Sequence, residues 1–196
     1  MTGRLAVFEA VDRWFLLKIN RDWTARSLDA VMPVITDLHR EKWFVYGVVP
    51  AALALWLWKG KKRALKVLVV AALAVGAGDL LSYRVLKPFL SRPRPSYAGV
   101  AVVERAPIRG ALSFPSNHAV NMGAAAAVLT VAYPGGAYAF WAVAGLIAYS
   151  RVYVGAHYPA DVIGGLMLGA ALGWPWALLM LGGDGGGGTA RKKKGR

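Results

Sequence analysis

The chain of 196 residues contains no cysteine, which excludes structural disulfides, thiolate catalysis and cysteine-ligated zinc. Acidic residues are scarce, with 10 Asp and Glu against 24 Lys and Arg, and their scatter along the sequence disfavours a two-metal site. Charged residues make up only 17% of the chain and apolar residues 57%, and the mean hydropathy is +0.42. This composition disfavours an ordinary water-soluble domain.

The basic residues lie between apolar runs rather than in a separate basic domain. One cluster occupies residues 59–66 and another occupies residues 191–196. Such clusters beside apolar segments are typical of chains held against anionic lipid headgroups. The net charge of +14 therefore indicates a membrane protein, and no nucleic-acid partner is expected.

A membrane-spanning helix needs about 20 mostly apolar residues. We expect an all-α membrane protein, a six-transmembrane-helix bundle whose single domain covers residues 1–181. The candidate spans, several of them short, are 27–38, 43–58, 64–86, 118–133, 137–150 and 161–181. Residues 1–17, interrupted by Glu9, Asp12 and Arg13, are expected to form an interfacial helix rather than a cleaved signal peptide. Residues 182–196 are expected to form a flexible, Gly-rich, basic cytoplasmic tail.

An excess of Lys and Arg in short connections marks the cytoplasmic side of a membrane protein. This rule places both termini, the loop 59–63 and the turn 134–136 in the cytoplasm, and the segments 88–115 and 150–160 outside. The outer segment is itself basic, with Glu104 opposed by Lys87, Arg92, Arg94, Arg105 and Arg109. A binding site for an anionic substrate would explain this departure from the rule.

The outer segment begins with Lys87 and Arg94 in the stretch LKPFLSRPRP. Its prolines force an extended, rigid path, so the two cations are fixed relative to each other before a ligand binds. Arg94 is suited to bind phosphate through two hydrogen bonds. Taken alone, this motif is equally consistent with a juxtamembrane loop whose cations only reach toward headgroups.

A second motif, Pro115-Ser116-Asn117-His118, stands where the outer segment enters an apolar run. Free backbone N–H groups at a helix start favour anions. A serine hydroxyl there donates to a phosphate oxygen, and a histidine passes a proton to a leaving oxygen. A plain N-cap is a strong alternative for Ser116, but it leaves His118 unexplained.

A third motif contains Arg151, His157 and Asp161. Pro159 is expected in the first turn of the last helix, so the side chains of His157 and Asp161 meet about one turn apart. A carboxylate that holds one imidazole nitrogen leaves the other as a nucleophile or base. Taken alone, the pair is equally consistent with helix capping.

Together, the patterns KxxxxxxRP, PSxH and SRxxxxxHxxxD, in this order and on one predicted side, resemble the type 2 phosphatidic acid phosphatase superfamily over residues 64–181. The resemblance implies a lipid phosphatase that uses a phosphohistidine intermediate and no metal or other cofactor. The phosphate-binding residues that it implies are Lys87, Arg94, Ser116, Asn117 and Arg151. It further implies His157 as the nucleophile, Asp161 as its orienting carboxylate and His118 as the general acid.

Asn117 stands where the commonest family pattern has glycine. Asparagine keeps the amide hydrogen and tolerates left-handed backbone angles, so the binding function is expected to persist. Asp79 lies within a predicted span, where a carboxylate is a functional candidate; a supporting role beside residues 82–84 is expected. His39 matches no motif and is expected at the surface.

Gly165, Gly169 and Gly173 repeat at four-residue spacing on the last predicted helix. Small residues at this spacing let helices approach closely. We expect them to serve packing within the bundle rather than dimerisation.

The expected partners are the bilayer and a membrane lipid phosphate, bound at an extracytoplasmic active site of a multi-pass protein. The resemblance allows undecaprenyl diphosphate, phosphatidylglycerol phosphate, phosphatidic acid or a lipid A phosphate. We favour an undecaprenyl-diphosphate-like lipid, a common substrate of short bacterial members. The alternatives are a lipid-to-lipid phosphotransferase and a non-catalytic lipid-binding or transport protein.

Overall fold

The computed structural model describes residues 2–182, and this part of the chain consists of helices and connecting segments without a β-strand. The α-helices are α1 Thr2–Leu17, α2 Arg26–Asp37, α3 Val49–Leu81, α4 Lys87–Leu90, α5 Asn117–Ala132, α6 Ala137–Tyr153 and α7 Pro159–Leu181. Short π and 3-10 segments extend or join them: η1 Lys18–Asp22, η2 Leu38–Arg40, η3 Phe44–Val48, η4 Ser82–Leu86 and η5 Pro134–Gly136. The predicted all-α class is confirmed. The predicted tail, apart from Gly182, lies outside the described residues.

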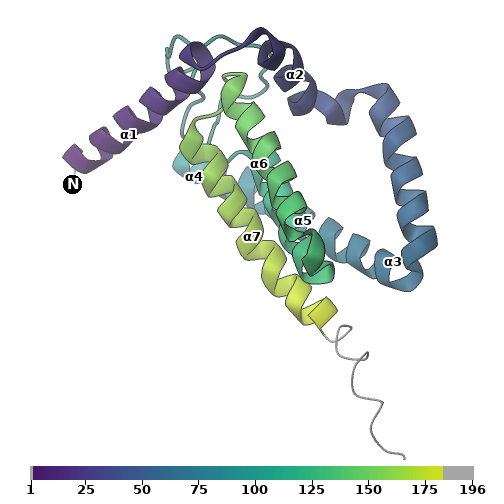
Figure 1. Cartoon of the computed structure of the whole chain (residues 1–196). Helices are drawn as coiled ribbons and strands as arrows, with labels where there is room; N and C mark the ends of the chain where they lie inside the picture. The colour runs from purple at the N-terminus through teal and green to yellow at the C-terminus, as the bar shows by residue number, and fades with distance from the viewer. Residues whose placement is uncertain (1, 183–196) are drawn as a thin grey trace, which may run out of the picture.

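Helix α5 forms the centre of the bundle, where it packs against α7, α3 and α6 (Figure 1). Its sequence, NHAVNMGAAAAVLTVA, is rich in small residues, so neighbouring backbones approach it closely. The largest buried apolar cluster joins α3, α5 and α7 through Val67, Val70, Ala74, Ala124, Val128, Ala132, Ala177 and Leu181. The core therefore holds the helices whose ends carry the second and third motifs.

The glycines of α7 face α5 rather than the outside of the bundle. A Cβ added at Gly165 would lie 2.8 Å from the carbonyl oxygen of Ser116, and one added at Gly173 would overlap backbone atoms of Ala124. At Gly169 the added atom would overlap the carbonyl oxygen of Val120. The prediction that these glycines serve internal packing is confirmed, because only hydrogen side chains fit here.

Helix α3 reverses direction at Lys61, whose φ of 46° and ψ of −126° are not helical. The apolar runs predicted at 43–58 and 64–86 are therefore separate helical stretches on the two sides of this turn (Figure 1). The turn carries the basic cluster of residues 59–66. Charged side chains thus gather where the chain changes direction, as expected for a loop at a membrane surface.

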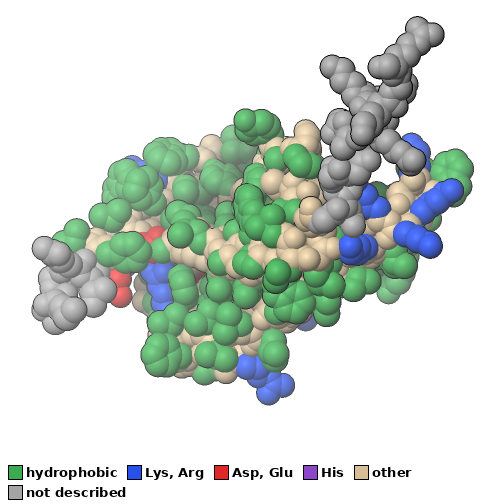
Figure 2. Space-filling view, turned by 90° about the horizontal axis from the view of Figure 1, so that it is seen from below, with side chains coloured by type: hydrophobic (Ala, Val, Ile, Leu, Met, Phe, Trp, Pro, Cys, Tyr) green, Lys and Arg blue, Asp and Glu red, His purple; other side chains and the backbone are tan. Residues whose placement is uncertain are grey.

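Within residues 2–182, two helical stretches are long and apolar enough to cross a membrane, Phe44–Leu90 with a mean hydropathy of 2.0 and Pro159–Leu181 with 1.7. Large apolar side chains are exposed along these stretches, and Figure 2 shows apolar groups over most of one face. Exposed apolar surface of this extent indicates contact with lipid. The predicted count of six spans is not confirmed, because α2 has 12 residues, a length of about 18 Å, against a hydrocarbon core of about 30 Å.

The chain between α1 and α2, together with α2 itself, docks on the end of α6 that carries Arg151. The side-chain amide of Asn20 donates to the carbonyl oxygen of Tyr153 at 2.7 Å, and the Tyr153 hydroxyl donates to Asp29 at 2.7 Å. Arg151 Nη1 donates to the hydroxyl of Thr36 at 2.6 Å. Helix α2 therefore lies across the end of the bundle, although the sequence predicted a span there.

Candidate active site

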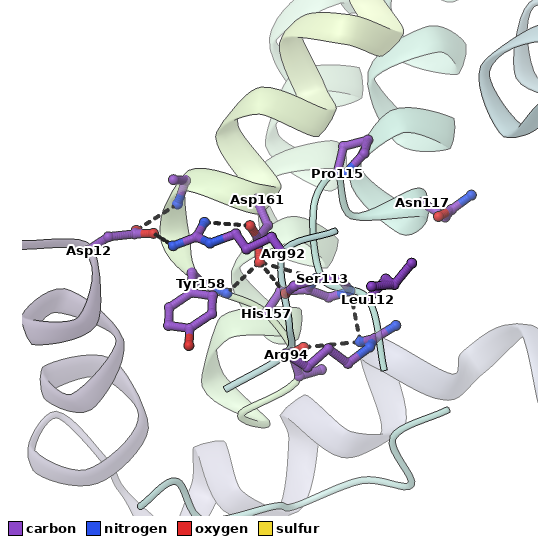
Figure 3. Close-up of polar contacts among 12 residues, drawn as sticks. Asp12, Arg92, Arg94, Leu112, Ser113, Pro115, Asn117, His157, Tyr158 and Asp161 are labelled. Atoms are coloured by element: carbon purple, nitrogen blue, oxygen red, sulfur yellow. Dashed lines mark hydrogen bonds and ion pairs between the residues drawn. The ribbon is translucent and has the colours of Figure 1, made fainter. Parts of the chain in front are cut away.

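The three sequence motifs meet at the end of the bundle where residues 91–116 connect α4 to α5. Arg94 comes from this connection, and His118 lies in the first turn of α5. Arg151 lies near the end of α6, and Asp161 lies in the first turn of α7. His157 belongs to the short link between these two helices, and Figure 3 shows its contacts with Arg94 and with residues of the α7 turn.

Both ring nitrogens of His157 have defined partners. Nη1 of Arg94 lies 3.0 Å from Nε2, while the Ser113 hydroxyl lies 3.3 Å and Oδ2 of Asp161 lies 3.5 Å from Nδ1. A guanidinium only donates hydrogen bonds, so Nε2 is the accepting nitrogen and the proton belongs on Nδ1. This network assigns the tautomer in which Nδ1 carries the proton and Nε2 carries a lone pair that accepts from Arg94.

The electrostatic environment of His157 keeps its imidazole neutral. Only 2% of the residue is exposed, and burial lowers the pKa of His157 from 6.5 to about 3. The hydrogen bond and charge of Asp161 raise this pKa, whereas the charges of Arg94 and Arg151 lower it. Since burial disfavours the imidazolium ion, His157 is neutral at physiological pH.

Asp161 is fully buried, and both of its oxygens accept hydrogen bonds. Oδ1 accepts from Nη1 of Arg92 at 2.6 Å, and Oδ2 accepts from the backbone N–H of Tyr158 at 2.9 Å and from the Ser113 hydroxyl. The bond from Tyr158 is typical of a carboxylate in the first turn of a helix. The predicted meeting of Asp161 with His157 is observed, and the carboxylate is held rigidly behind the ring.

A cavity of about 350 Å³ opens in front of this pair. Its lining includes the predicted residues Arg94, Asn117, His118, Arg151 and His157. Within the described residues, the buried atoms Nε of Arg94, Nε of Arg151 and Oγ of Ser116 lack hydrogen-bond partners. Buried donors without partners are costly, so this arrangement suits an anion that accepts several hydrogen bonds.

Lys87, like Ser116 and unlike Arg94, Asn117 and Arg151, lies behind the lining of the cavity. Its ammonium is buried and donates to the carbonyl oxygens of Pro115 at 2.9 Å, Leu112 at 3.3 Å and Ser113 at 3.5 Å. Lys87 does not line the 350 Å³ cavity. In this arrangement it holds the connection that precedes α5 and thereby positions the second motif.

The side chain of Asn117 is held by Asp79 of α3 and by Ser82 of η4. Its amide donates to Oδ1 of Asp79 at 2.8 Å, and its Oδ1 accepts from the Ser82 hydroxyl at 3.2 Å. Asn121 also donates to Asp79, at 3.3 Å. Asp79 is thus connected to the site through Asn117. Ser82 also bonds to the side chain of Asn117 and not to Asp79.

His39 is exposed, as predicted, but it also belongs to the wall of the cavity. Its ring meets that of His118 edge to face, with the ring centroids 5.1 Å apart. Asp37 and Arg40, from the end of α2 and from η2, line the same cavity. No signal of this contact is visible in the sequence, because residues 37–40 match no motif and lie far from α5 in the chain.

Ser113 and Arg92 are further site residues that the sequence analysis did not assign. Ser113 bridges His157 and Asp161, and Arg92 contacts Asp161. Arg92 lies inside the first motif, two positions before Arg94, so its position in a rigid basic stretch was an available signal. Ser113 carried no comparable signal.

Within residues 2–182, no group of three or more His, Asp or Glu side chains is placed to hold a metal ion. Asp161, whose Oδ2 lies 3.5 Å from Nδ1 of His157, accepts hydrogen bonds from Arg92, Tyr158 and Ser113. The site is therefore defined by a neutral histidine, a buried carboxylate behind it and arginines beside it, all at one end of a helical membrane protein.

Comparison with known proteins identifies the family to which the chain belongs. Residues 63–182 match the PAP2 superfamily, and the chain belongs to this family. The structure is similar to that of a transmembrane PAP2 type phosphatidylglycerolphosphate phosphatase from Bacillus subtilis, with a TM-score of 0.65, 25% identity and coverage of 91% of this chain and 86% of the other. The predicted resemblance is confirmed.

Two curated relatives have named lipid substrates. A decaprenylphosphoryl-5-phosphoribose phosphatase of Mycolicibacterium smegmatis is 42% identical over 98 residues, covering 47% of this chain and 51% of the relative. An undecaprenyl-diphosphatase of Sulfolobus acidocaldarius is 30% identical over 148 residues, covering 74% and 66%. The chain thus spans about half the length of the first relative and about two thirds of the second.

Proposed function

We propose that the protein is a metal-independent phosphatase of a membrane lipid phosphate or diphosphate. The observation that carries the proposal is the neutral His157, with Nδ1 directed to Asp161 and Ser113 and with Nε2 beside Arg94. A neutral imidazole among fixed cations is suited to attack an anionic phosphate, because the cations offset the charge of the substrate.

In the first step, Nε2 of His157 attacks phosphorus, the bond from phosphorus to the leaving oxygen breaks, and His118, which enters the cycle in its protonated form, gives its proton to that oxygen. Asp161 stabilises the positive charge that develops on the ring of His157. In the second step, water attacks the phosphohistidine, the N–P bond breaks, and His118 takes the proton from the water. Inorganic phosphate and the dephosphorylated lipid leave, and the starting protonation states are restored.

The phosphate oxygens are proposed to bind the groups whose donors lack partners. Nε of Arg94, Nε of Arg151 and Oγ of Ser116 supply these donors, and the N–H of Asn117 at the start of α5 adds another. Arg94, which contacts Nε2 of His157, exchanges that contact for phosphate oxygens when substrate binds. Lys87 contributes its positive charge from behind the connection that it holds.

The cavity supports a preference for a substrate with a second anionic group, such as undecaprenyl diphosphate. Besides the motif residues, Arg109 lines it, and within the described residues Arg109 forms neither a hydrogen bond nor an ion pair. Arg40 lies in the same wall but is 3.6 Å from Asp37, so Arg109 is the cation available for a second phosphate. Two of the relatives are named for phosphorylated prenyl lipids, which supports this preference, whereas others are named for lipid A.

The active-site end is proposed to face the extracytoplasmic side, with the basic turn of α3 and the C-terminal tail in the cytoplasm. The sequence also predicts a cytoplasmic N-terminus, which requires α2 to cross the membrane. Because α2 contacts Arg151 at the active-site end, we propose instead that α1 and α2 lie at the outer interface.

The test is phosphate release by the purified protein from undecaprenyl diphosphate, phosphatidylglycerol phosphate, phosphatidic acid and lipid A, with and without an acceptor lipid. His157→Ala serves as the inactive control. Release from at least one lipid by the wild type alone supports the proposal. Transfer to the acceptor instead of release identifies a phosphotransferase, and binding without turnover of any lipid overturns the catalytic assignment.

A further inference from the structure

Arg92 lies between two carboxylates that come from opposite ends of the chain. Its Nη1 donates to Oδ1 of Asp161 at 2.6 Å, and its Nη2 donates to Oδ2 of Asp12 at 2.6 Å (Figure 3). The guanidinium also lies over the ring of Tyr158, 4.1 Å from the centroid. Because these contacts use both terminal nitrogens and one face of the group, the orientation of Arg92 is fixed.

Asp12 is the contact through which α1 reaches the active site. Only 5% of Asp12 is exposed, and its second oxygen accepts from the backbone N–H of Ala160 at 2.8 Å. Ala160 lies in the first turn of α7, where backbone N–H groups have no partner within the helix. Asp12 thus holds both Arg92 and the helix start that carries Asp161.

Apart from Leu16, which is fully buried in an apolar cluster with Ala119 and Val162, the large side chains of α1 are mostly exposed. Phe8, Trp14 and Phe15 are between 42% and 55% exposed, and a cavity of about 650 Å³ separates part of α1 from α7. Glu9, one turn before Asp12, borders the same cavity without a hydrogen bond or ion pair in the described part of the chain. Asp12 therefore supplies the polar contacts that join this stretch of α1 to the site, while Leu16 supplies the apolar one.

We propose that Arg92 and Asp12 are positioning residues of the active site. Asp12 fixes Arg92, Arg92 fixes Asp161, and Asp161 keeps the proton of His157 on Nδ1, so that Nε2 is the nucleophile. This inference rests on the proposed function in taking His157 as the nucleophile. Both residues border the 650 Å³ cavity between α1 and α7, but neither lines the 350 Å³ cavity that contains His157, so they are expected to act on the chemical step rather than on the binding of the phosphate.

The first test separates turnover from binding. Arg92→Gln is expected to lower kcat by about 10- to 100-fold, the usual effect of removing an outer partner that orients a functional ligand, with KM unchanged. Arg92→Lys, which keeps the charge but not the paired geometry, is expected to recover part of this loss. Asp12→Asn is expected to lower kcat by about 3- to 10-fold, as for one lost hydrogen bond.

The double variant Asp12→Asn/Arg92→Gln tests whether Asp12 acts through Arg92. Its kcat is expected to equal that of Arg92→Gln alone, since residues acting in one chain are not additive. Glu9→Gln, the same charge change on the same helix, is expected to leave kcat at the wild-type value. Multiplicative losses in the double variant, or equal losses with Glu9→Gln, would overturn the proposal.

A readout without turnover keeps this inference distinct from the phosphatase assignment. The chain has three histidines, so ¹⁵N-histidine labelling in a His39→Gln/His118→Gln background leaves only His157 visible. Its ring nitrogen shifts are expected to report the Nδ1–H tautomer in that background and a mixture of tautomers after Arg92→Gln or Asp12→Asn. Unchanged shifts in both variants would refute the positioning role, whether or not any lipid is hydrolysed.

Discussion

Arg94 donates to the nitrogen of His157 that the proposed mechanism uses as the nucleophile, at a distance of 3.0 Å. The same Nη1 also donates to the carbonyl oxygen of Ala156 at 3.0 Å. Nη1 is therefore engaged twice, whereas Nε of Arg94 has no hydrogen-bond partner. A phosphate that binds Nε and then displaces Nη1 from His157 would uncover the lone pair only when substrate is present.

Substitution of His157 and substitution of His118 are expected to impair different steps of the reaction. His157→Ala should abolish both turnover and any covalent phosphoenzyme, because the attacking nitrogen is lost. His118→Ala should retain phosphoenzyme formation with an aryl phosphate whose leaving group needs no proton, whereas loss of general acid and base catalysis slows turnover by about 10²- to 10⁴-fold. Rapid-quench labelling measures both, and label in His157→Ala but none in His118→Ala would reverse the assignments.

The pKa of His157 predicts a specific dependence of stability on pH. Burial lowers this pKa to about 3 from 6.5, so between these values the unfolded chain binds a proton that the folded chain does not. Stability is therefore expected to decrease as pH falls through this window, by up to about 1.4 kcal/mol per pH unit from this residue. Thermal unfolding in detergent at pH 7.5 and 5 should show a larger drop for the wild type than for His157→Gln. Equal drops would contradict the burial argument.

The contact between α5 and α7 predicts opposite effects for two glycine substitutions. Gly169→Ala places a methyl group 2.6 Å from the backbone nitrogen of Ala124 and should destabilise the protein by about 1 to 3 kcal/mol. Gly76→Ala meets no atom within 4 Å and should stabilise α3 by up to about 1 kcal/mol through helix propensity. Thermal unfolding in one detergent compares them, and equal melting temperatures would argue against tight packing at Gly169.

The proposed topology is accessible to cysteine labelling because the chain contains no cysteine. Cysteines that replace the exposed Ala98 and Glu104 should react with a membrane-impermeant reagent on intact cells, whereas one that replaces the exposed Lys62 should react only after lysis. A cysteine at Glu9 should behave like the first two if α1 lies at the outer interface. If only Lys62→Cys is labelled on intact cells, the topology is the reverse of the one proposed.

Metal independence is expected because the proposed nucleophile is a neutral histidine and its partners are arginines and one carboxylate. Activity should survive excess chelator. Vanadate, which adopts the five-coordinate geometry of phosphoryl transfer, should inhibit competitively with the lipid phosphate. Loss of activity in chelator with recovery on added magnesium would contradict the mechanism.

The sequence predicted the helices best where apolar runs and motif spacing agreed. Asp161 meets His157 because α7 begins at Pro159, which places Asp161 in the first turn of the helix, next to the link that carries His157; the proline and the four-residue spacing are visible in the sequence. The contacts of His39 with His118 and of Asp12 with Arg92 join segments that are distant in the chain, and no local pattern encodes them. The span predicted at 27–38 is not confirmed, and Thr36 and Asp29 form polar contacts at the active-site end that hydropathy alone does not detect.

Backbone hydrogen bonds join the start and the end of the connection between the first two motifs. The N–H of Arg94 donates to the carbonyl oxygen of Ala111 at 2.8 Å, the N–H of Ser113 donates to that of Arg92 at 2.7 Å, and the ammonium of Lys87 secures the strand of chain that follows. Residues 95–110 therefore leave and rejoin the site at two points that backbone hydrogen bonds hold. Substitutions in the exposed part of this segment, including the cavity wall at Arg109, are expected to leave the geometry of the reacting groups unchanged. Recognition of the lipid headgroup and the chemistry of phosphate transfer are in this way open to separate evolution, and to separate engineering.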